Sequence, residues 1–217
     1  MTRFQGTDTK SSPDFYQAHY RAYHDRTFPV DATPFLNPFQ KRLPRGATVL
    51  DVGCGSGRDL LWLNQRGFAV VGLERSPGLA DLARKHVGCK VIQADFENFD
   101  FSSLAVDAVM MSGSLVHVPH VRLPVVLARI LRACHPGQGS DQALAGSSPK
   151  MSKHVYISLK EGRTTKKFAD GRIFYLWKRQ TVLSMLEQQG LTVLEVLQTV
   201  SPLRAEDVWL AFIASIP

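Results

Sequence analysis

The chain has 217 residues, 44% of them hydrophobic and 21% charged, with a net charge of +7 at pH 7. These values are those of a soluble globular protein, and the length suits one domain, 1–217, with a substantial core. The sequence contains no apolar stretch near the ~18 residues that a membrane-spanning helix needs. The polar N-terminus lacks the apolar core of a signal peptide, so we expect a cytoplasmic protein.

The three cysteines, at positions 54, 89 and 134, are widely separated. They are too few and too scattered for a metal-binding knuckle or a disulfide framework. We therefore expect no metal site.

The N-terminal segment divides into a polar and a helical part. Residues 1–12 are polar and show no periodicity, which predicts disorder. Over 15–26, Tyr16, Tyr20 and Tyr23 recur at i, i+4 and i+7, which predicts a helix within an N-terminal helical cap over 13–45. Such an aromatic stripe is typical of packing, and it is also compatible with a helix lying over a cofactor.

A glycine-rich turn follows the first predicted strand, 47–53. The apolar run that contains Asp51 breaks into Gly53, Gly55 and Gly57. Glycines let backbone N–H groups and a helix N-terminus meet a ligand directly, as a nucleotide-like cofactor requires at the carboxyl edge of a parallel sheet. The pattern is G-x-G-x-G rather than the G-x-G-x-x-G of NAD-binding proteins, because Arg58 stands where a third glycine would be expected.

The next two predicted strands also end in carboxylates. Strand 69–74 ends at Glu74, 23 residues after Asp51, close to the offset of ~20 residues at which an acidic side chain binds a ribose. Strand 90–94 is followed by Asp95 and Phe96, a carboxylate for an adenine amino group and a ring to pack on the base. Each feature alone is also an ordinary strand end.

Strands and helices alternate along the rest of the chain. Helix 57–66 follows the glycine turn, and Ser76 and Pro77 begin the next helix. The later elements are a strand at 105–111, a helix from Pro124, a strand at 154–159, a helix at 179–189 and strands at 191–200 and 208–213. This order predicts an α/β fold with a doubly wound, mostly parallel seven-stranded sheet. Seven residues join the last two strands, too few for a helical crossover, so the last strand should be antiparallel.

Two segments depart from this alternation. Residues 138–150 are rich in Gly, Ser and Ala, which predicts a flexible insertion. Residues 150–180 hold nine basic and two acidic side chains, an excess of seven positive charges. Such a stretch could bind nucleic acid or a small anion, or form a solvated face.

The glycine loop, Asp51-Val52-Gly53-Cys54-Gly55-Ser56-Gly57-Arg58-Asp59, resembles motif I of the class I S-adenosylmethionine (SAM)-dependent methyltransferases. From about Tyr23 to Ile213 the chain looks like a bacterial subgroup of small methyltransferase-domain proteins often compared with tellurite-resistance methyltransferases. Other matching segments are 23–27, 114–118, 158–162 and 170–174, with Arg204 and Trp209 near the end. In similar sequences a tryptophan is expected where Met110 stands.

The resemblance implies a Rossmann-like enzyme that uses SAM and releases S-adenosylhomocysteine (SAH). The residues expected at the cofactor are Asp51, Gly53, Gly55, Gly57, Arg58, Glu74, Arg75, Asp95, Phe96, Ser112 and Gly113. His117, on the loop leading to the acceptor, is the candidate base, although it could equally pack and hold that loop. Residues expected at the acceptor, where cations favour an anion, are Tyr23, Arg26, Lys160, Arg172 and Arg204.

Four functions remain open from the sequence. The first is methyl transfer to a small molecule, with no membrane partner. The second is methylation of tRNA or rRNA through the basic stretch, although Met111-Ser112-Gly113-Ser114 is not the Asp/Asn-Pro-Pro-aromatic segment used for exocyclic amino groups of nucleic acids. The third is a SAM-binding protein without catalysis, and the fourth an NAD-dependent oxidoreductase, which Arg58 disfavours.

Overall fold

The computed structural model describes residues 12–135 and 152–216. Its centre is a seven-stranded sheet in the order β3-β2-β1-β4-β5-β9-β8. The bounds are β1 Thr48–Val52, β2 Ala69–Glu74, β3 Lys90–Gln93, β4 Ala108–Ser112, β5 Lys153–Lys160, β8 Thr192–Ser201 and β9 Arg204–Ile216. β9 runs antiparallel to both β5 and β8, while the pairs among β1 to β5 are parallel. The predicted mostly parallel seven-stranded sheet with a reversed last strand is confirmed.

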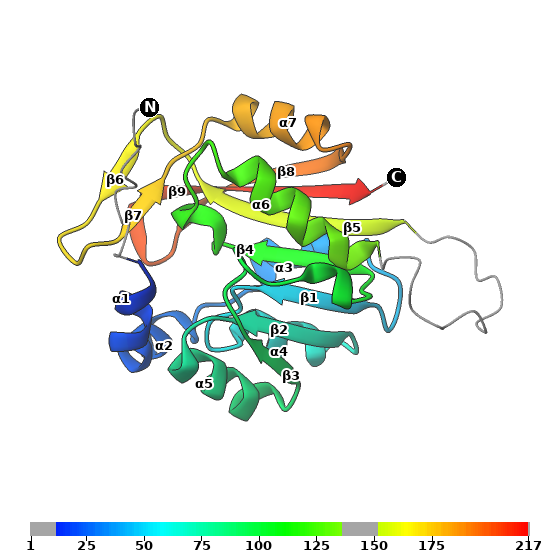
Figure 1. Cartoon of the computed structure of the whole chain (residues 1–217), viewed down its shortest axis with the longest axis horizontal. Helices are drawn as coiled ribbons and strands as arrows, with labels where there is room; N and C mark the ends of the chain where they lie inside the picture. The colour runs from blue at the N-terminus through cyan, green and yellow to red at the C-terminus, as the bar shows by residue number, and fades with distance from the viewer. Residues whose placement is uncertain (1–11, 136–151, 217) are drawn as a thin grey trace, which may run out of the picture.

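Helices cover both faces of this sheet (Figure 1). Their bounds are α1 Ser12–Ala18, α2 Tyr20–Thr27, α3 Thr33–Gln40, α4 Arg58–Asn64, α5 Pro77–Val87, α6 Leu123–Ile130 and α7 Arg179–Gln188. Short 3-10 helices lie at Phe101–Ser103, Leu115–His117 and Leu131–Cys134. In the described part of the chain, no helix has the length and apolar character needed to cross a membrane.

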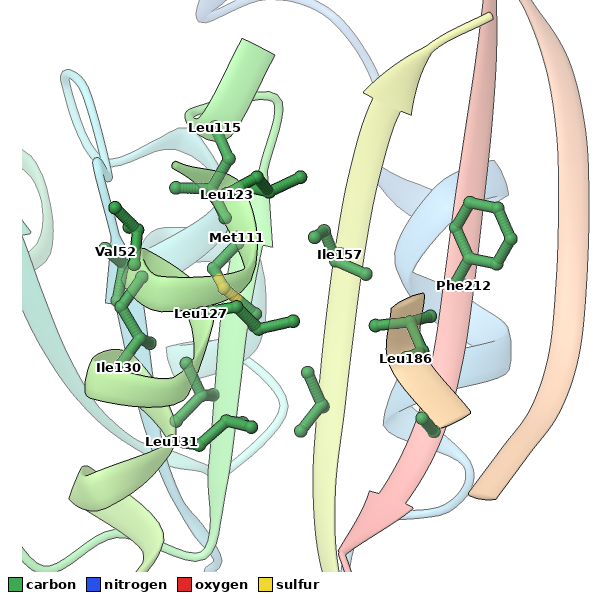
Figure 2. Packing of buried hydrophobic residues seen from close by; sticks show 14 of the residues in the cluster. Val52, Met111, Leu115, Leu123, Leu127, Ile130, Leu131, Ile157, Leu186 and Phe212 are labelled. Atoms are coloured by element: carbon green, nitrogen blue, oxygen red, sulfur yellow. The ribbon is translucent and has the colours of Figure 1, made fainter. Parts of the chain in front are cut away.

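The period-two alternation of the strands divides the core into two layers. Met111, Ile157 and Phe212 point to the face covered by α6 and α7, where Leu127 and Leu186 pack against them (Figure 2). Each such side chain contributes about 1.5–3 kcal/mol by leaving water. The neighbouring strand positions point to the opposite face and pack on α3 and α4; they include Val49, Met110 and Tyr156. Met110, at the tryptophan position of similar sequences, is therefore a core residue.

Local signals set the ends of α5. The backbone N–H of Leu79 donates to Ser76 Oγ at 3.4 Å, and Pro77 occupies the first turn. Gly88 ends the helix in the left-handed region at φ 70°. Because the helix is capped at Ser76, only Arg75 separates the cap from Glu74 at the carboxyl end of β2.

The structure differs from the sequence prediction in three places. The single helix expected over 15–26 is two helices, because His19 adopts the non-helical dihedrals φ −119° and ψ 23°. The last two strands are joined by only two residues, since β9 begins at Arg204. A second sheet, β6 (Thr165–Lys167) with β7 (Ile173–Tyr175), was not predicted, because strands of three residues carry no detectable period.

The N-terminal helices and this small hairpin sit at one end of the main sheet. Figure 1 shows α1 and α2 beyond the carboxyl ends of β1, β2 and β4, with the β6–β7 hairpin nearby. Helices α2 and α3 fall within the segment predicted as a helical cap, 13–45, and α1 begins one residue before it. Of the residues predicted to be disordered, 1–12, Ser12 begins α1 and residues 1–11 lie outside the described residues, as does the predicted insertion at 138–150.

Candidate functional site

The glycine loop between β1 and α4 holds three glycines with positive φ. Gly53, Gly55 and Gly57 have φ values of 74°, 56° and 88°. A Cβ at Gly55 would meet nothing closer than the Tyr23 ring at 3.7 Å, whereas a Cβ at Gly57 would lie 3.0 Å from Ala83 in α5. The three glycines therefore have different roles. Gly53 leaves room for Ser114, whose Cβ would clash with an added Cβ. Gly55 borders a cavity beside Tyr23, and Gly57 allows α4 and α5 to pack closely.

Glu74 connects the ends of β1 and β2. Its carboxylate accepts the backbone N–H of Gly55 at 2.9 Å and that of Ser76 at 2.8 Å. Burial raises the pKa of this carboxyl, although the hydrogen bonds oppose the rise. Each oxygen keeps a lone pair for another donor, so the side chain can both fix the loop and accept from a ligand hydroxyl.

Asp51 lies beneath the loop with 2% of its surface exposed. Its Oδ1 has no hydrogen-bond partner among the described residues. Burial raises the pKa of this carboxyl well above its usual range, and the nearby Asp59 carboxylate raises it further. Asp59 itself pairs with Arg58, Oδ1 to Nε at 2.5 Å. A buried acceptor without a partner is a place where a ligand donor fits.

Three adjoining cavities open around this loop. The loop cavity, of about 190 Å³, is bordered by Asp51, the glycine loop, Ser112 and Tyr156. The Glu74 cavity, of about 90 Å³, is lined by Glu74, Arg75, Phe96 and His117 among others. The Lys160 cavity, of about 180 Å³, lies over the ends of β5 and β9. Tyr23 and Gly113 line all three, so the cavities meet there.

Most residues predicted at the cofactor lie together at these cavities. The loop or Glu74 cavity is lined by Asp51, Gly53, Gly55, Arg58, Glu74, Arg75, Phe96, Ser112 and Gly113. Gly57 and Asp95 line none of the three. The carboxylate of Asp95 instead accepts the backbone N–H of Glu97 and pairs with Arg75, both at 2.9 Å. It can therefore position Arg75 at the cavity.

His117 lies between the N-terminal helix and the β6–β7 hairpin. Its Nδ1 is 2.9 Å from the carbonyl oxygen of Ile173, and its Nε2 is 2.8 Å from the hydroxyl of Tyr16. Because a carbonyl can only accept, Nδ1 carries the proton and Nε2 accepts from Tyr16. Burial lowers the pKa of His117 to about 4. These contacts fit a neutral imidazole that holds the loop and α1 together.

All five residues predicted at the acceptor line the Lys160 cavity: Tyr23, Arg26, Lys160, Arg172 and Arg204. Two of these cations are already paired. Lys160 bonds to Asp207, which Lys166 also contacts at 3.2 Å, and Arg172 bonds to Asp170, Nη2 to Oδ2 at 2.6 Å. Arg26 and Arg204 form no ion pair with any described residue.

Aromatic rings complete this cavity. The ammonium of Lys160 lies 4.5 Å from the ring centre of Phe174 and 5.2 Å from that of Trp209. The guanidinium of Arg172 lies 4.0 Å from the ring centre of Phe15. Rings at these distances stabilise the buried cations, and Phe174 and Trp209 also give the cavity apolar walls.

The sequence analysis did not assign roles to Tyr16 or Asp207. The aromatic stripe in the N-terminal segment contained Tyr16, but nothing in the pattern pointed to His117. Asp207 stands 47 positions after Lys160, and only the register of β9 against β5 brings the two together. Among residues 12–135 and 152–216, no group of three or more His, Cys, Asp or Glu side chains could hold a metal ion.

Comparisons with known proteins agree with this geometry. Residues 49–137 match a family described as a methyltransferase domain. A ubiquinone biosynthesis O-methyltransferase from Hahella chejuensis is 28% identical over 161 residues, which cover 68% of this chain and 67% of that protein. The chain spans 55% of a second curated relative with the same name, from Xanthomonas axonopodis.

Solved structures share the fold. Magnesium protoporphyrin IX methyltransferase from Synechocystis, with bound SAM, superposes with a TM-score of 0.70 at 14% identity and full coverage of both chains. A TehB-like SAM-dependent methyltransferase from Corynebacterium glutamicum gives 0.66 at 21% identity, covering 92% of this chain and 99% of the other.

The position of Gly55 at the loop cavity and the unpartnered Oδ1 of Asp51 fit a cofactor with its own donors, which here is SAM. Residues 49–137 thus carry a methyltransferase domain, the chain has the fold of SAM-dependent methyltransferases, and together with the loop and the relatives these findings support a class I SAM-dependent methyltransferase.

Proposed function

We propose that the protein transfers the methyl group of SAM to a small anionic acceptor held in the Lys160 cavity. SAM supplies an electrophilic methyl group on a sulfonium, and the protein mainly aligns the acceptor with it. Asp51, Gly55 and Glu74 would bind the cofactor in the loop and Glu74 cavities. Tyr23 and Gly113, where the cavities meet, would flank the transferred group.

The charge of the Lys160 cavity is the observation that carries this proposal. Its charged lining residues and their ion-pair partners comprise five cations, Arg26, Lys160, Lys166, Arg172 and Arg204, against the two carboxylates Asp170 and Asp207. Lys160 and Arg172 are buried and paired. The exposed Arg26 and Arg204, by contrast, leave a net positive charge at the cavity that attracts an anionic ligand. The "O-methyltransferase" in the relative's name supports oxygen as the acceptor atom.

Methylation of RNA is the second candidate, and the basic stretch is its support. Lys153, Lys160, Lys166 and Arg172 of that stretch pair with carboxylates, and Lys160 and Arg172 are buried. Such side chains offer little to a phosphate backbone. A salt-dependent gel shift with bulk tRNA would favour the RNA candidate.

SAH formation tests the proposal directly. The protein is incubated with SAM and a deproteinised low-mass metabolite fraction, and SAH is measured. We expect SAH to form above the level without the metabolites, and Arg204→Gln to reduce it at least tenfold at low acceptor concentration. Lys178→Gln, an exposed cation outside the three cavities, is the matched control. SAH formation no greater than without metabolites would contradict catalysis and leave a SAM-binding protein.

A further inference from the structure

We infer that the methylated atom is an ionised carboxylate oxygen, so that the product is a methyl ester. This inference rests on the proposed function and adds the acceptor's chemical class. It follows from what the Lys160 cavity contains and from what it lacks.

Among the described residues, the lining of this cavity offers neither an imidazole nor an unpaired carboxylate to remove a proton from an acceptor. Asp207 is the one carboxylate among the described lining residues, and Lys160 and Lys166 both hold it. Burial raises the pKa of the phenols of Tyr16 and Tyr23, so both stay protonated. An alcohol or amine acceptor, which must lose a proton during methylation, would find no base here.

His117 does not fill this role. It lines the Glu74 cavity rather than the Lys160 cavity. Its Nε2 already accepts from Tyr16, and the low pKa of its imidazole makes it a weak proton acceptor. The contacts on both ring nitrogens describe a residue that positions Tyr16 and the loop.

The cavity instead favours a nucleophile that is ionised before it binds. Surrounding cations hold a carboxylic acid in its carboxylate form. Arg26 and Arg204 come from opposite elements, α2 and β9, and both lack an ion-pair partner among the described residues. A guanidinium that binds one carboxylate oxygen leaves the other oxygen able to attack.

The reaction balances without a proton. A lone pair of the carboxylate oxygen forms the new O–C bond to the methyl group, and the C–S bond breaks with its electron pair remaining on sulfur. The positive sulfonium and the negative carboxylate become a neutral thioether and a neutral ester. Methylation of an alcohol or an amine would release one proton per turnover.

Two properties of the product test the inference. The protein is incubated with SAM carrying a tritiated methyl group and the deproteinised metabolite fraction, and the products are then treated with mild base. A methyl ester releases volatile tritiated methanol, whereas ethers and N-methyl groups keep the label. Proton release is measured in weak buffer with a pH indicator, and we expect none beyond the SAM-only control.

The outcomes separate the two proposals. Label that becomes volatile in base, without proton release, supports the ester. Label that enters products but stays fixed in base, or one proton per methyl transferred, overturns the inference while methyl transfer stands. No labelled product at all contradicts the proposed function itself.

A binding measurement gives a readout independent of turnover. Benzoate and benzamide have the same shape and differ in charge, so we titrate each into the protein saturated with SAH. We expect benzoate to bind at least tenfold more tightly, and Arg204→Gln to remove that difference while Lys178→Gln retains it. Equal binding of the two probes by the unaltered protein would overturn the inference.

Discussion

The hydroxyl of Tyr16 in α1 donates to Nε2 of His117, 101 positions later in the chain. The same imidazole donates from Nδ1 to the carbonyl of Ile173 in the β6–β7 hairpin. One neutral ring therefore joins three segments around the cavities, and its protonation would remove the acceptor that Tyr16 uses.

Acid should weaken the fold through this ring. The pKa of His117 is about 4 in the native state, against an ordinary value of 6.5, so the unfolded chain takes up a proton first as the pH falls. Stability linked to His117 is complete above pH 6.5 and falls between pH 6.5 and 4, by roughly 3 kcal/mol at most. Urea unfolding at pH 7, 5.5 and 4.5 should show a smaller pH dependence for His117→Asn than for the unaltered protein. Identical pH dependence would contradict this assignment.

Alanine substitutions at two glycines of the loop should have different effects: Gly57→Ala should mainly lower stability, and Gly55→Ala should mainly lower cofactor affinity. Gly57→Ala places a methyl group 3.0 Å from Ala83 and Val87, so we expect a loss of more than 2 kcal/mol of stability. Gly55→Ala adds only the left-handed backbone cost of about 1 kcal/mol, but fills space at the cavity.

Gly46→Ala is the control for those two variants, because its φ is 72° and nothing lies within 4 Å of the added atom. Thermal unfolding and calorimetric SAH binding should place Gly57→Ala below Gly46→Ala in stability, and Gly55→Ala below it in affinity. Equal stability of Gly57→Ala and Gly46→Ala would show that the helices can move apart.

Glu74→Gln should weaken cofactor binding. The amide keeps one acceptor oxygen but places an NH2 group against the backbone N–H of Gly55 or Ser76. We expect SAM affinity to fall by about 1–3 kcal/mol, the range for leaving a buried polar group without its partner. Calorimetry on the folded variant measures this, and unchanged affinity would remove Glu74 from the cofactor site.

Arg172→Lys should loosen α1. The guanidinium bonds to Asp170 through Nε and Nη2 and packs on Phe15, and an ammonium cannot reproduce both contacts. We expect faster hydrogen exchange of the α1 amides and a stability loss of about 1–2 kcal/mol. Arg163→Lys, an exposed change just before β6, should leave α1 exchange unaltered. If both variants behave alike, the Phe15 contact does not anchor the helix.

The sequence predicted those parts of the fold that depend on local pattern. Apolar strands, the Ser76 cap and the glycine turn each carry a signal within a few residues, and β2 was predicted with the bounds observed. The break at His19 and the short β6–β7 hairpin have no such signal, because tertiary packing outweighs propensity there.

In the candidate site, too, the residues with a local sequence signal were identified, and the contacts that depend on tertiary structure were not. Asp51, Glu74 and Ser112, which the sequence singled out by residue type at strand ends, line the cavities, and their contact with the cofactor stays a prediction. The pairing of Lys160 with Asp207 depends on strand register, and the role of Gly57 depends on how close α5 lies. Neither the strand register nor the closeness of α5 can be derived from the sequence alone.

Of the described residues that line the Lys160 cavity, only Gly113 and Val116 fall within 49–137, the segment shared with the methyltransferase family. Under the proposed function, most of the acceptor cavity is therefore formed by residues outside the segment shared with the family. Within the β8–β9 tip, Ser201, Pro202 and Leu203 border the loop cavity, whereas Arg204 borders the Lys160 cavity alone. Substitutions at Arg204 therefore offer a way to change which molecule is methylated without altering a residue that lines the loop cavity.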